Sequence, residues 1–122
     1  MKPKILIIDD VPANIFLLGK LLGEDYEIVF AKSGNEGIKI ASRELPDIIL
    51  LDVMMPEMDG FETCTRLKNN DALKEIPVIF VTALDEDLSE TNGLKVGAVD
   101  YLFKPINPEI VKAKVKKYLK KN

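Results

Sequence analysis

Short apolar runs alternate along the chain with longer segments in which apolar residues recur every three or four positions. The apolar runs span residues 5–8, 28–31, 48–51, 78–81 and 101–103. Continuous apolar runs of this length are typical of parallel strands buried on both faces, and the segments between them have the period of amphipathic helices. The pattern therefore predicts an α/β fold in three layers, in which a doubly wound, five-stranded parallel sheet lies between two layers of helices.

The helical period is clearest in the first and the last of the intervening segments. Apolar residues follow it at Ile15, Leu18, Leu21 and Leu22, and again at Val111, Val115, Tyr118 and Leu119. Pro12 suits the first turn of the first helix, where a missing N–H group leaves no helix hydrogen bond unmade. Asp59, directly before Gly60, is in place to cap the start of the third helix. We expect both apolar stripes to face the core.

The composition is that of one ordinary globular domain, so we expect residues 1–122 to form a single unit. Hydrophobic residues make up 47% and charged residues 30% of the chain, which excludes a disordered, collagen-like or disulfide-rich class. The formal net charge of −3 gives no reason to expect nucleic-acid binding. No stretch approaches the roughly 20 apolar residues of a membrane span, and the acidic pair within residues 1–12 argues against a signal peptide. These features predict a cytoplasmic protein without membrane insertion.

The chain contains no histidine and a single cysteine, Cys64. These counts exclude an internal disulfide and a zinc site built from cysteine and histidine. They also remove the usual general base and the nucleophile pairs that depend on histidine. Any chemistry must therefore rest on carboxylates, lysine, hydroxyl groups and a hard metal ion. Cys64 itself is expected to be a small apolar residue on the third helix.

Polar residues follow four of the five apolar runs at their carboxyl ends. They are Asp9 and Asp10, Asp52, Thr82 and Lys104. In an open parallel sheet of the flavodoxin-like strand order 2-1-3-4-5, ligands bind outside the carboxyl ends of strands one and three. An acid at a strand end is by itself usually a turn or capping residue, but several polar residues that meet at one edge of a sheet indicate a site. We expect such a convergence here.

Three carboxylates beside one lysine leave a site short of positive charge. Two carboxylates about 5 Å apart repel each other by roughly 3 kcal/mol at an effective dielectric constant of about 20, so the site should attract a cation. Oxygen ligands alone favour Mg²⁺ or Mn²⁺, and a magnesium ion that keeps several waters is commonly paired with a phosphoryl ligand. Asp52 would then be the nucleophile that forms an aspartyl phosphate, while Lys104 and the Thr82 hydroxyl contact the phosphoryl oxygens.

Four segments together resemble the receiver domain of bacterial two-component response regulators, over essentially the whole chain. The segments are Asp9 with Asp10, residues 52–60 with the stretch MPEMDG at 55–60, Thr82 with Ala83, and residues 97–105 (GAVDYLFKP). Each segment alone is a weak signal, but their order and their positions at strand ends are specific. The resemblance implies signalling by phosphorelay, with no enzymatic activity beyond self-phosphorylation from small donors and slow self-dephosphorylation.

The resemblance also assigns roles to the acidic residues and the lysine. Asp52 would accept a phosphoryl group from a phosphohistidine on a histidine kinase or a histidine phosphotransfer protein. Asp9, Asp10, Asp52 and the backbone carbonyl of Met54 would hold Mg²⁺, or Mn²⁺ in its place. Lys104 would pair with the phosphoryl group.

A second set of residues would carry the signal outward. The resemblance implies that the backbone of Ala83 contacts the phosphoryl group, that Thr82 swings towards it, and that Tyr101 turns inward. These movements would reshape the face formed by helix four, strand five and helix five, which would bind an output domain or protein or support a phosphorylation-dependent dimer. In the family the bond between Lys104 and Pro105 is usually cis, and we expect a cis bond here.

Two positions bear on the lifetime of the phosphoryl group. Met54 and Leu84, which lie two residues beyond Asp52 and Thr82, are apolar. Some relatives carry polar side chains there that help to place the hydrolytic water. We predict that the phosphoryl group is lost over minutes or longer rather than seconds.

Three other functions remain open at this point. A phosphatase of the haloacid dehalogenase type also forms an aspartyl phosphate with Mg²⁺, but its second acid lies two residues beyond the nucleophile, whereas Asp9 and Asp10 are adjacent. A flavodoxin-like flavin protein needs a phosphate-binding loop after the first strand, where the acidic pair would repel a flavin phosphate. A receiver that only docks partners, without phosphorylation, would keep the same fold.

The start of the first helix carries a further, weaker resemblance. Residues 9–14 (DDVPAN), with Leu17 and Leu18, resemble receivers fused to modules that make cyclic dinucleotides or to histidine-kinase modules. The chain is therefore either a stand-alone receiver or one domain of a longer regulator, and its cognate kinase and its output are not specified by these residues.

Overall fold

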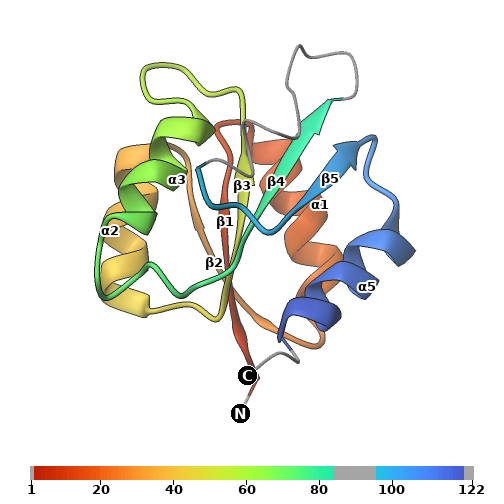
Figure 1. The fold of residues 1–122 in the computed structure, drawn as a ribbon. Helices are drawn as coiled ribbons and strands as arrows, with labels where there is room; N and C mark the ends of the chain where they lie inside the picture. The colour runs from red at the N-terminus through yellow and green to blue at the C-terminus, as the bar shows by residue number, and fades with distance from the viewer. Residues whose placement is uncertain (1, 84–95, 120–122) are drawn as a thin grey trace.

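The computed structural model describes residues 2–83 and 96–119, in which strands and helices alternate (Figure 1). The elements are β1 (Lys4–Ile8), α1 (Pro12–Leu22), β2 (Glu27–Ala31), α2 (Gly34–Glu44), β3 (Ile48–Asp52), α3 (Gly60–Lys68), β4 (Val78–Ala83), β5 (Asp100–Lys104) and α5 (Pro108–Leu119). The expected fourth helix of the signalling face and Leu84 both lie outside the described residues.

The five strands form one parallel sheet in the order β2-β1-β3-β4-β5, which confirms the predicted order 2-1-3-4-5. In this register Ile8 lies opposite both Ala31 on β2 and Leu51 on β3. One residue further along, Asp52 lies opposite Val81 on β4. The carboxyl ends of the central strands therefore lie level at one edge of the sheet.

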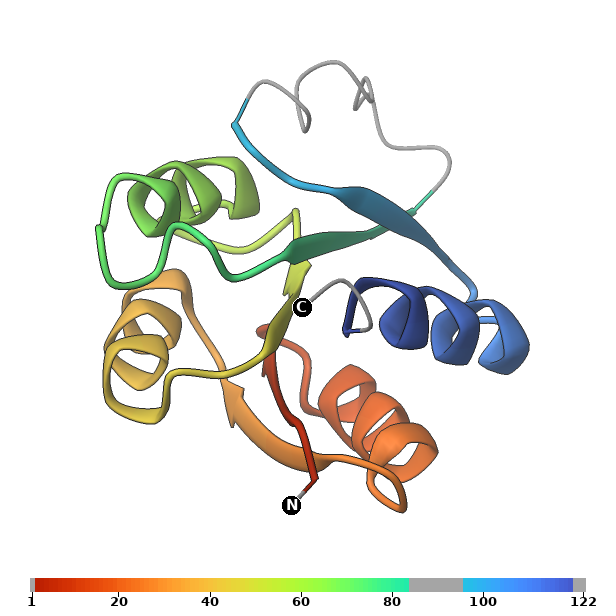
Figure 2. The ribbon, with the colours of Figure 1, turned by 60° about the horizontal axis from the view of Figure 1, so that its bottom comes forward.

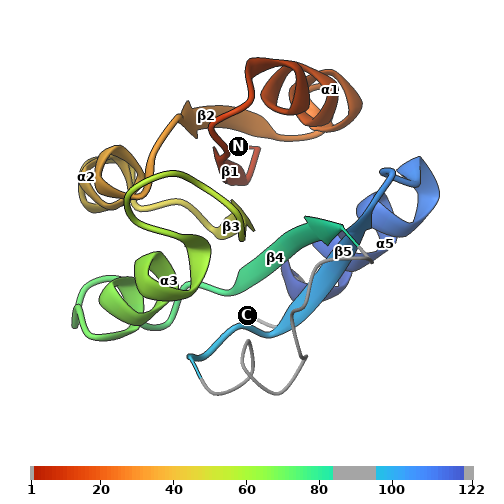
Figure 3. The ribbon, with the colours of Figure 1, turned by 90° about the horizontal axis from the view of Figure 1, so that it is seen from above.

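Two layers of helices cover the sheet, with α1 and α5 on one face and α2 and α3 on the other (Figures 2 and 3). Successive residues of a strand point to opposite faces, so Ile5 and Ile7 pack towards α1 and α5 while Leu6 and Ile8 pack towards α2 and α3. All four side chains are at most 1% exposed. Burial on both faces explains the continuous apolar runs, and the predicted three-layer arrangement is confirmed.

The two predicted helix stripes face the core. Buried residues of the stripes are Ile15, Leu18, Leu22, Val111 and Val115, while Leu21, Tyr118 and Leu119 are partly buried against the same cluster. Cys64 on α3 is fully buried, as expected for a small apolar residue. No helix within residues 2–83 and 96–119 combines the length and the apolar character needed to cross a membrane.

Local capping signals start the helices. α1 begins at Pro12, and the carboxylate of Asp59 accepts a hydrogen bond of 2.9 Å from the N–H of Glu62 at the start of α3, so both predictions hold. The cap of α2 was not singled out in the sequence. There the Ser33 hydroxyl accepts a hydrogen bond of 3.1 Å from the N–H of Glu36.

Three strands, β3, β4 and β5, run beyond the carboxyl ends of their apolar runs. Thr82 pairs with Phe103 and Ala83 with Lys104, so the β4–β5 ladder includes the polar residues at the carboxyl edge. Asp52 likewise is the last residue of β3. Three of the candidate side chains (Asp52, Thr82 and Lys104) therefore rise from paired strands and not from loops, which fixes the position of their backbone.

Candidate functional site

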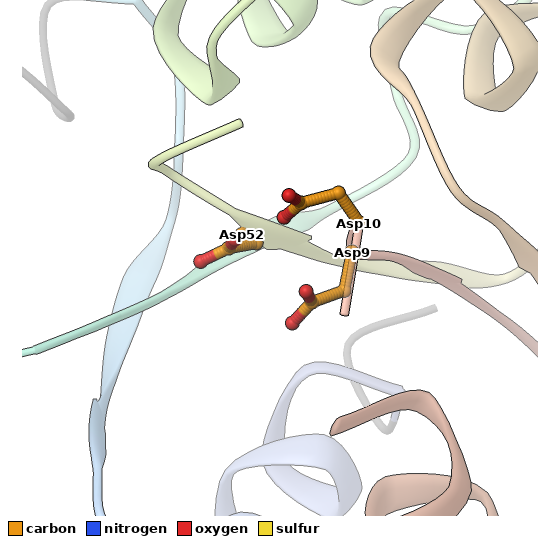
Figure 4. A group of neighbouring side chains, drawn as sticks. All are labelled: Asp9, Asp10 and Asp52. Carbon is orange, nitrogen blue, oxygen red and sulfur yellow. The ribbon is translucent and has the colours of Figure 1, made fainter. Parts of the chain in front are cut away.

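Three aspartates meet at the carboxyl edge of the sheet, where Asp9 and Asp10 follow β1 and Asp52 ends the adjacent strand β3 (Figure 4). One carboxylate oxygen from each of them lies within 4.8 Å of the others. The register of β1 and β3 causes this meeting, since Ile8 lies opposite Leu51 and the acids are the next residues on each strand. The edge between the first and third strands is also the place where the strand order reverses.

The three acidic residues differ in their exposure to solvent. Asp9 and Asp52 are only 2% and 4% exposed, whereas Asp10 is half-buried. The Asp9 carboxylate accepts a hydrogen bond of 2.9 Å from the N–H of Val11. Asp52 accepts one of 3.3 Å from the ammonium group of Lys104, which reaches it from the end of β5. Asp10 is thus the acid most open to solvent and Asp52 the one tied to the lysine.

Burial makes ionisation of this cluster costly. Burial, together with the charge of Asp9, raises the pKa of Asp52 to about 6, although Lys104 acts in the opposite direction. Burial also raises the pKa of Asp9, against the lowering effect of the Val11 N–H. Lys104 alone does not balance three carboxylates.

The donor set fits a hard divalent cation. The ligand atoms that converge are carboxylate oxygens, with no nitrogen or sulfur donor among the three residues. Mg²⁺ and Mn²⁺ prefer such ligands, and a bound cation would relieve the repulsion that raises the pKa of Asp52. Met54, whose backbone carbonyl was expected to join the set, lies two residues beyond Asp52 with its side chain 58% exposed.

Thr82 and Ala83 end β4 beside the cluster. Thr82 is 2% exposed, and its hydroxyl lies 3.5 Å from the carbonyl oxygen of Ala83. The ladder places Ala83 opposite Lys104, whose ammonium contacts Asp52. Hydroxyl, main-chain and ammonium groups therefore gather at the same edge as the acids. The Lys104–Pro105 bond is cis, as the resemblance implied.

Tyr101 lies inward, in a row of aromatic rings that crosses from α3 to the edge strand β5. Its ring centroid is 5.8 Å from that of Phe80 and 5.9 Å from that of Phe103, with which it stacks at 5°. Phe80 in turn meets Phe61 edge to face at 5.2 Å. Tyr101 is 5% exposed, whereas Phe103 is 38% exposed at the outer end of the row.

Two features that position the acids were not found in the sequence. The N–H of Gly60 donates a hydrogen bond of 2.8 Å to the carbonyl of Val53, and a Cβ atom at Gly60 would lie 2.8 Å from the Val53 Cα and against the carbonyl oxygen of Asp52. Gly60 thus lets α3 begin directly against the end of β3. The Val11 N–H that holds Asp9 leaves no trace in the sequence, because every residue except proline carries this donor.

Known proteins resemble this chain in both sequence and structure. The chain is 47% identical over 117 residues to the response regulator PleD of Caulobacter vibrioides, a match that covers 95% of this chain and 26% of that protein. It is 39% identical over 123 residues to the alkaline phosphatase synthesis transcriptional regulatory protein PhoP of Bacillus subtilis, covering 100% of this chain and 50% of PhoP. The chain therefore spans between a quarter and a half of the length of these two relatives.

The solved structure of a putative response regulator from Chloroflexus aurantiacus matches with a TM-score of 0.93 at 32% identity, and the match covers 99% of this chain and 100% of that one. The sequence model of the response regulator receiver domain matches residues 5–116. These matches set aside the phosphatase and flavin-protein alternatives. The chain belongs to the response regulator receiver domain family of two-component signalling.

Proposed function

We propose that this receiver accepts a phosphoryl group on Asp52, from a phosphohistidine on a histidine kinase or a histidine phosphotransfer protein, in a reaction that requires Mg²⁺. The observation that carries the proposal is the position of Asp52, buried at the strand edge with two acids within 4.8 Å and Lys104 at 3.3 Å. One carboxylate is thereby held beside both a cation site and a fixed positive charge. This combination suits a nucleophile that carries a dianionic phosphoryl group after the reaction.

The proposed transfer forms one bond and breaks another. A carboxylate oxygen of Asp52 bonds to phosphorus as the phosphorus–nitrogen bond to the donor imidazole breaks, and the imidazole leaves with the electron pair of that bond. Asp9, Asp10, Asp52 and the Met54 carbonyl would hold Mg²⁺, which when bound neutralises charge on the acids and the phosphoryl oxygens. Lys104 would move from Asp52 to a phosphoryl oxygen, and the Thr82 hydroxyl and the Ala83 N–H would donate to the others.

The output would follow from the same contacts. If Thr82 turns towards the phosphoryl group, the space behind it changes, and the row of rings at Tyr101 and Phe103 can settle in a second packing on β5. The surface of β5 and α5 would then present a different face to an output domain or protein, or to a second receiver. The protein would act as a phosphoryl acceptor and switch, and not as an enzyme on other substrates.

The first test is the intact mass of the protein after incubation with Mg²⁺ and acetyl phosphate. The wild type should gain a single phosphoryl group, while Asp52→Asn and a sample with chelated metal should gain none. Asp71→Asn is the matched control, because Asp71 has a side chain that is 97% exposed; it should react like the wild type. If Asp52→Asn still gains the group, another residue is the acceptor. If the wild type gains none from acetyl phosphate or from a phosphorylated histidine phosphotransfer protein, a docking role without phosphorylation is favoured.

Mg²⁺ should raise the melting temperature, because the three carboxylates are brought together only in the folded chain. With free Mg²⁺ about tenfold above its dissociation constant, the stabilisation should be about 1.4 kcal/mol. Asp10→Asn removes the most exposed of the acids and should weaken the gain, whereas Asp71→Asn should leave it unchanged. Melting curves with and without millimolar Mg²⁺ test this. Curves that coincide for the wild type would argue against a metal site.

The phosphorylated protein should lose its phosphoryl group over minutes or longer. Met54 offers an exposed thioether side chain, which binds water weakly and would not hold a hydrolytic water in place. Introducing a carboxamide with Met54→Asn should therefore shorten the half-life. The decay of the phosphorylated mass in the presence of Mg²⁺ measures both rates. A half-life of seconds for the wild type would contradict the prediction.

A further inference from the structure

A hollow lies between α1 and the edge strand β2, on the side of the sheet that carries α1 and α5. A groove of about 760 Å³ opens there, and its apolar lining, called the α1–β2 groove below, consists of Pro12, Ile15, Phe16, Gly19, Ile28 and Phe30. Two largely exposed aromatic side chains border it. Phe16 is 70% exposed and Phe30 is 51% exposed. Figure 3 shows α1 beside β2 at this end of the sheet.

The groove lies at the β2 edge of the sheet. β2 pairs only with β1, so no strand of the described sheet lies beyond it. Single exposed apolar residues are common on protein surfaces, whereas here two exposed aromatic rings line one hollow. Phe16 and Phe30 come from different elements and meet only in the fold.

Gly19 keeps the floor of the groove open. It lies inside α1, where glycine is among the poorest helix formers. A Cβ atom at Gly19 would find only the Ile28 Cγ2 atom at 3.9 Å, which is an ordinary van der Waals contact, and its backbone has no positive φ. Neither packing nor backbone geometry therefore requires glycine at this position. The missing side chain leaves room for an atom of a bound molecule.

The lining of the groove carries positive charge. The charged residues that line it are Lys20 and Lys32, in a chain whose formal net charge is −3. The Lys20 ammonium lies 6.0 Å from the centre of the Phe16 ring. Within residues 2–83 and 96–119 neither ammonium has a carboxylate within ion-pair distance. Charge complementarity therefore favours an occupant that carries carboxylates beside its apolar part.

We propose that the α1–β2 groove binds a segment of a partner protein that inserts an aromatic or branched aliphatic side chain over Gly19 and places acidic residues against Lys20 and Lys32. The apolar floor would bury the inserted side chain, and the two lysines would orient the bound segment. The site is separate from the acidic cluster, and binding there does not depend on phosphorylation of Asp52.

Two short amphipathic peptides test the proposal. Both carry the same leucine and phenylalanine face, and their remaining positions are glutamate in one and lysine in the other. Titration into the ¹⁵N-labelled protein should move the amide signals of Phe16, Gly19 and Phe30 with the glutamate peptide, and the lysine peptide should bind at least about tenfold more weakly. Equal binding of the two peptides, no shift at the groove at millimolar glutamate peptide, or shifts confined to other surfaces would overturn the proposal.

Variants of the groove make the test specific. Gly19→Leu fills the floor and should weaken binding of the glutamate peptide by about tenfold or more, and Gly19→Ala, which fits without moving a neighbour, should weaken it less. The double variant Lys20→Glu/Lys32→Glu should prefer the lysine peptide. Lys39→Glu is the control, because it also replaces an exposed lysine with glutamate but lies on α2, away from the groove. This variant should bind the glutamate peptide like the wild type.

Two further outcomes would count against the proposal. Unchanged binding by Gly19→Leu, in protein whose spectrum shows it folded, would show that the peptide does not enter the groove. Shifts of the groove amides that depend on protein concentration without any peptide would identify a second copy of the chain as the occupant and overturn the assignment to an acidic partner.

Discussion

Replacing Gly60 with alanine should destabilise the fold by about 3 kcal/mol and impair phosphorylation of Asp52. The added Cβ would lie 2.8 Å from the Val53 Cα and against the Asp52 carbonyl, and both are main-chain atoms that cannot rotate away. Either the start of α3 or the end of β3 must shift. A shift of β3 moves Asp52 relative to Lys104 and the other acids, so stability and phosphoryl acceptance should fall together.

Gly19→Ala is the matched control for this change. Both glycines lie in helices and both variants add one methyl group, but at Gly19 the nearest atom is 3.9 Å away. Alanine there should raise the free energy of unfolding by up to about 1 kcal/mol, because it favours the helix. Urea denaturation gives both free energies. A Gly60→Ala protein as stable as the wild type would mean that α3 can retreat from β3 without cost, and that Gly60 does not position Asp52.

Without metal at neutral pH, Asp52→Asn should stabilise the fold by up to about 3 kcal/mol. The Asp52 carboxyl is 4% exposed, and burial together with Asp9 raises its pKa from 3.8 to about 6. A rise of about two pKa units corresponds to roughly 3 kcal/mol of cost for the charged form in the folded chain. Asparagine has nearly the same shape and carries no charge, so the cost disappears.

The pH dependence of this gain has a definite sign. Because the folded chain holds the Asp52 proton more tightly than the unfolded chain, the wild type loses stability as the pH rises from 3.8 to about 6. The variant lacks this loss, and its advantage should therefore be small near pH 4 and complete above pH 6. Denaturant titrations of both proteins across this range measure it, and Asp71→Asn, which replaces an exposed carboxylate with the same amide, is the matched control.

Mg²⁺ offers a second check on the same group. A cation held by Asp9, Asp10 and Asp52 would offset the repulsion in the wild type and bind Asp52→Asn less well. The stability advantage of the variant should accordingly shrink as Mg²⁺ is added. An Asp52→Asn protein less stable than the wild type in the absence of metal would show that Lys104 outweighs the burial of the carboxylate.

Much of the fold could be predicted because the signals that build it are local and repeated. The runs at 48–51 and 78–81 are apolar without alternation, which indicates strands covered on both faces, and such strands need helices between them. The meeting of Asp9 with Asp52 also followed, because parallel strands end at one edge and strands one and three are neighbours in the predicted order.

Other features depend on contacts between distant residues and could not be predicted. Lys68 appears in the sequence as one more charged residue at a helix end, yet its ammonium donates hydrogen bonds of 3.0 and 2.7 Å to the carbonyls of Lys74 and Ile76. Gly19 and Gly60 look alike in the sequence as glycines of helices. Only the neighbouring atoms reveal that a Cβ atom would make an ordinary contact at Gly19 and would press against the backbone of β3 at Gly60.

The row of rings around Tyr101 gives the protein an internal optical probe. The chain has no tryptophan and three tyrosines, so its near-ultraviolet spectrum is not dominated by indole absorption. A phenol packed between Phe80 and Phe103 sits in a rigid, chiral environment, which is the condition for a strong near-ultraviolet circular dichroism band. Repacking of Tyr101 can therefore be followed in the unlabelled protein, with Tyr101→Phe as the spectroscopic blank.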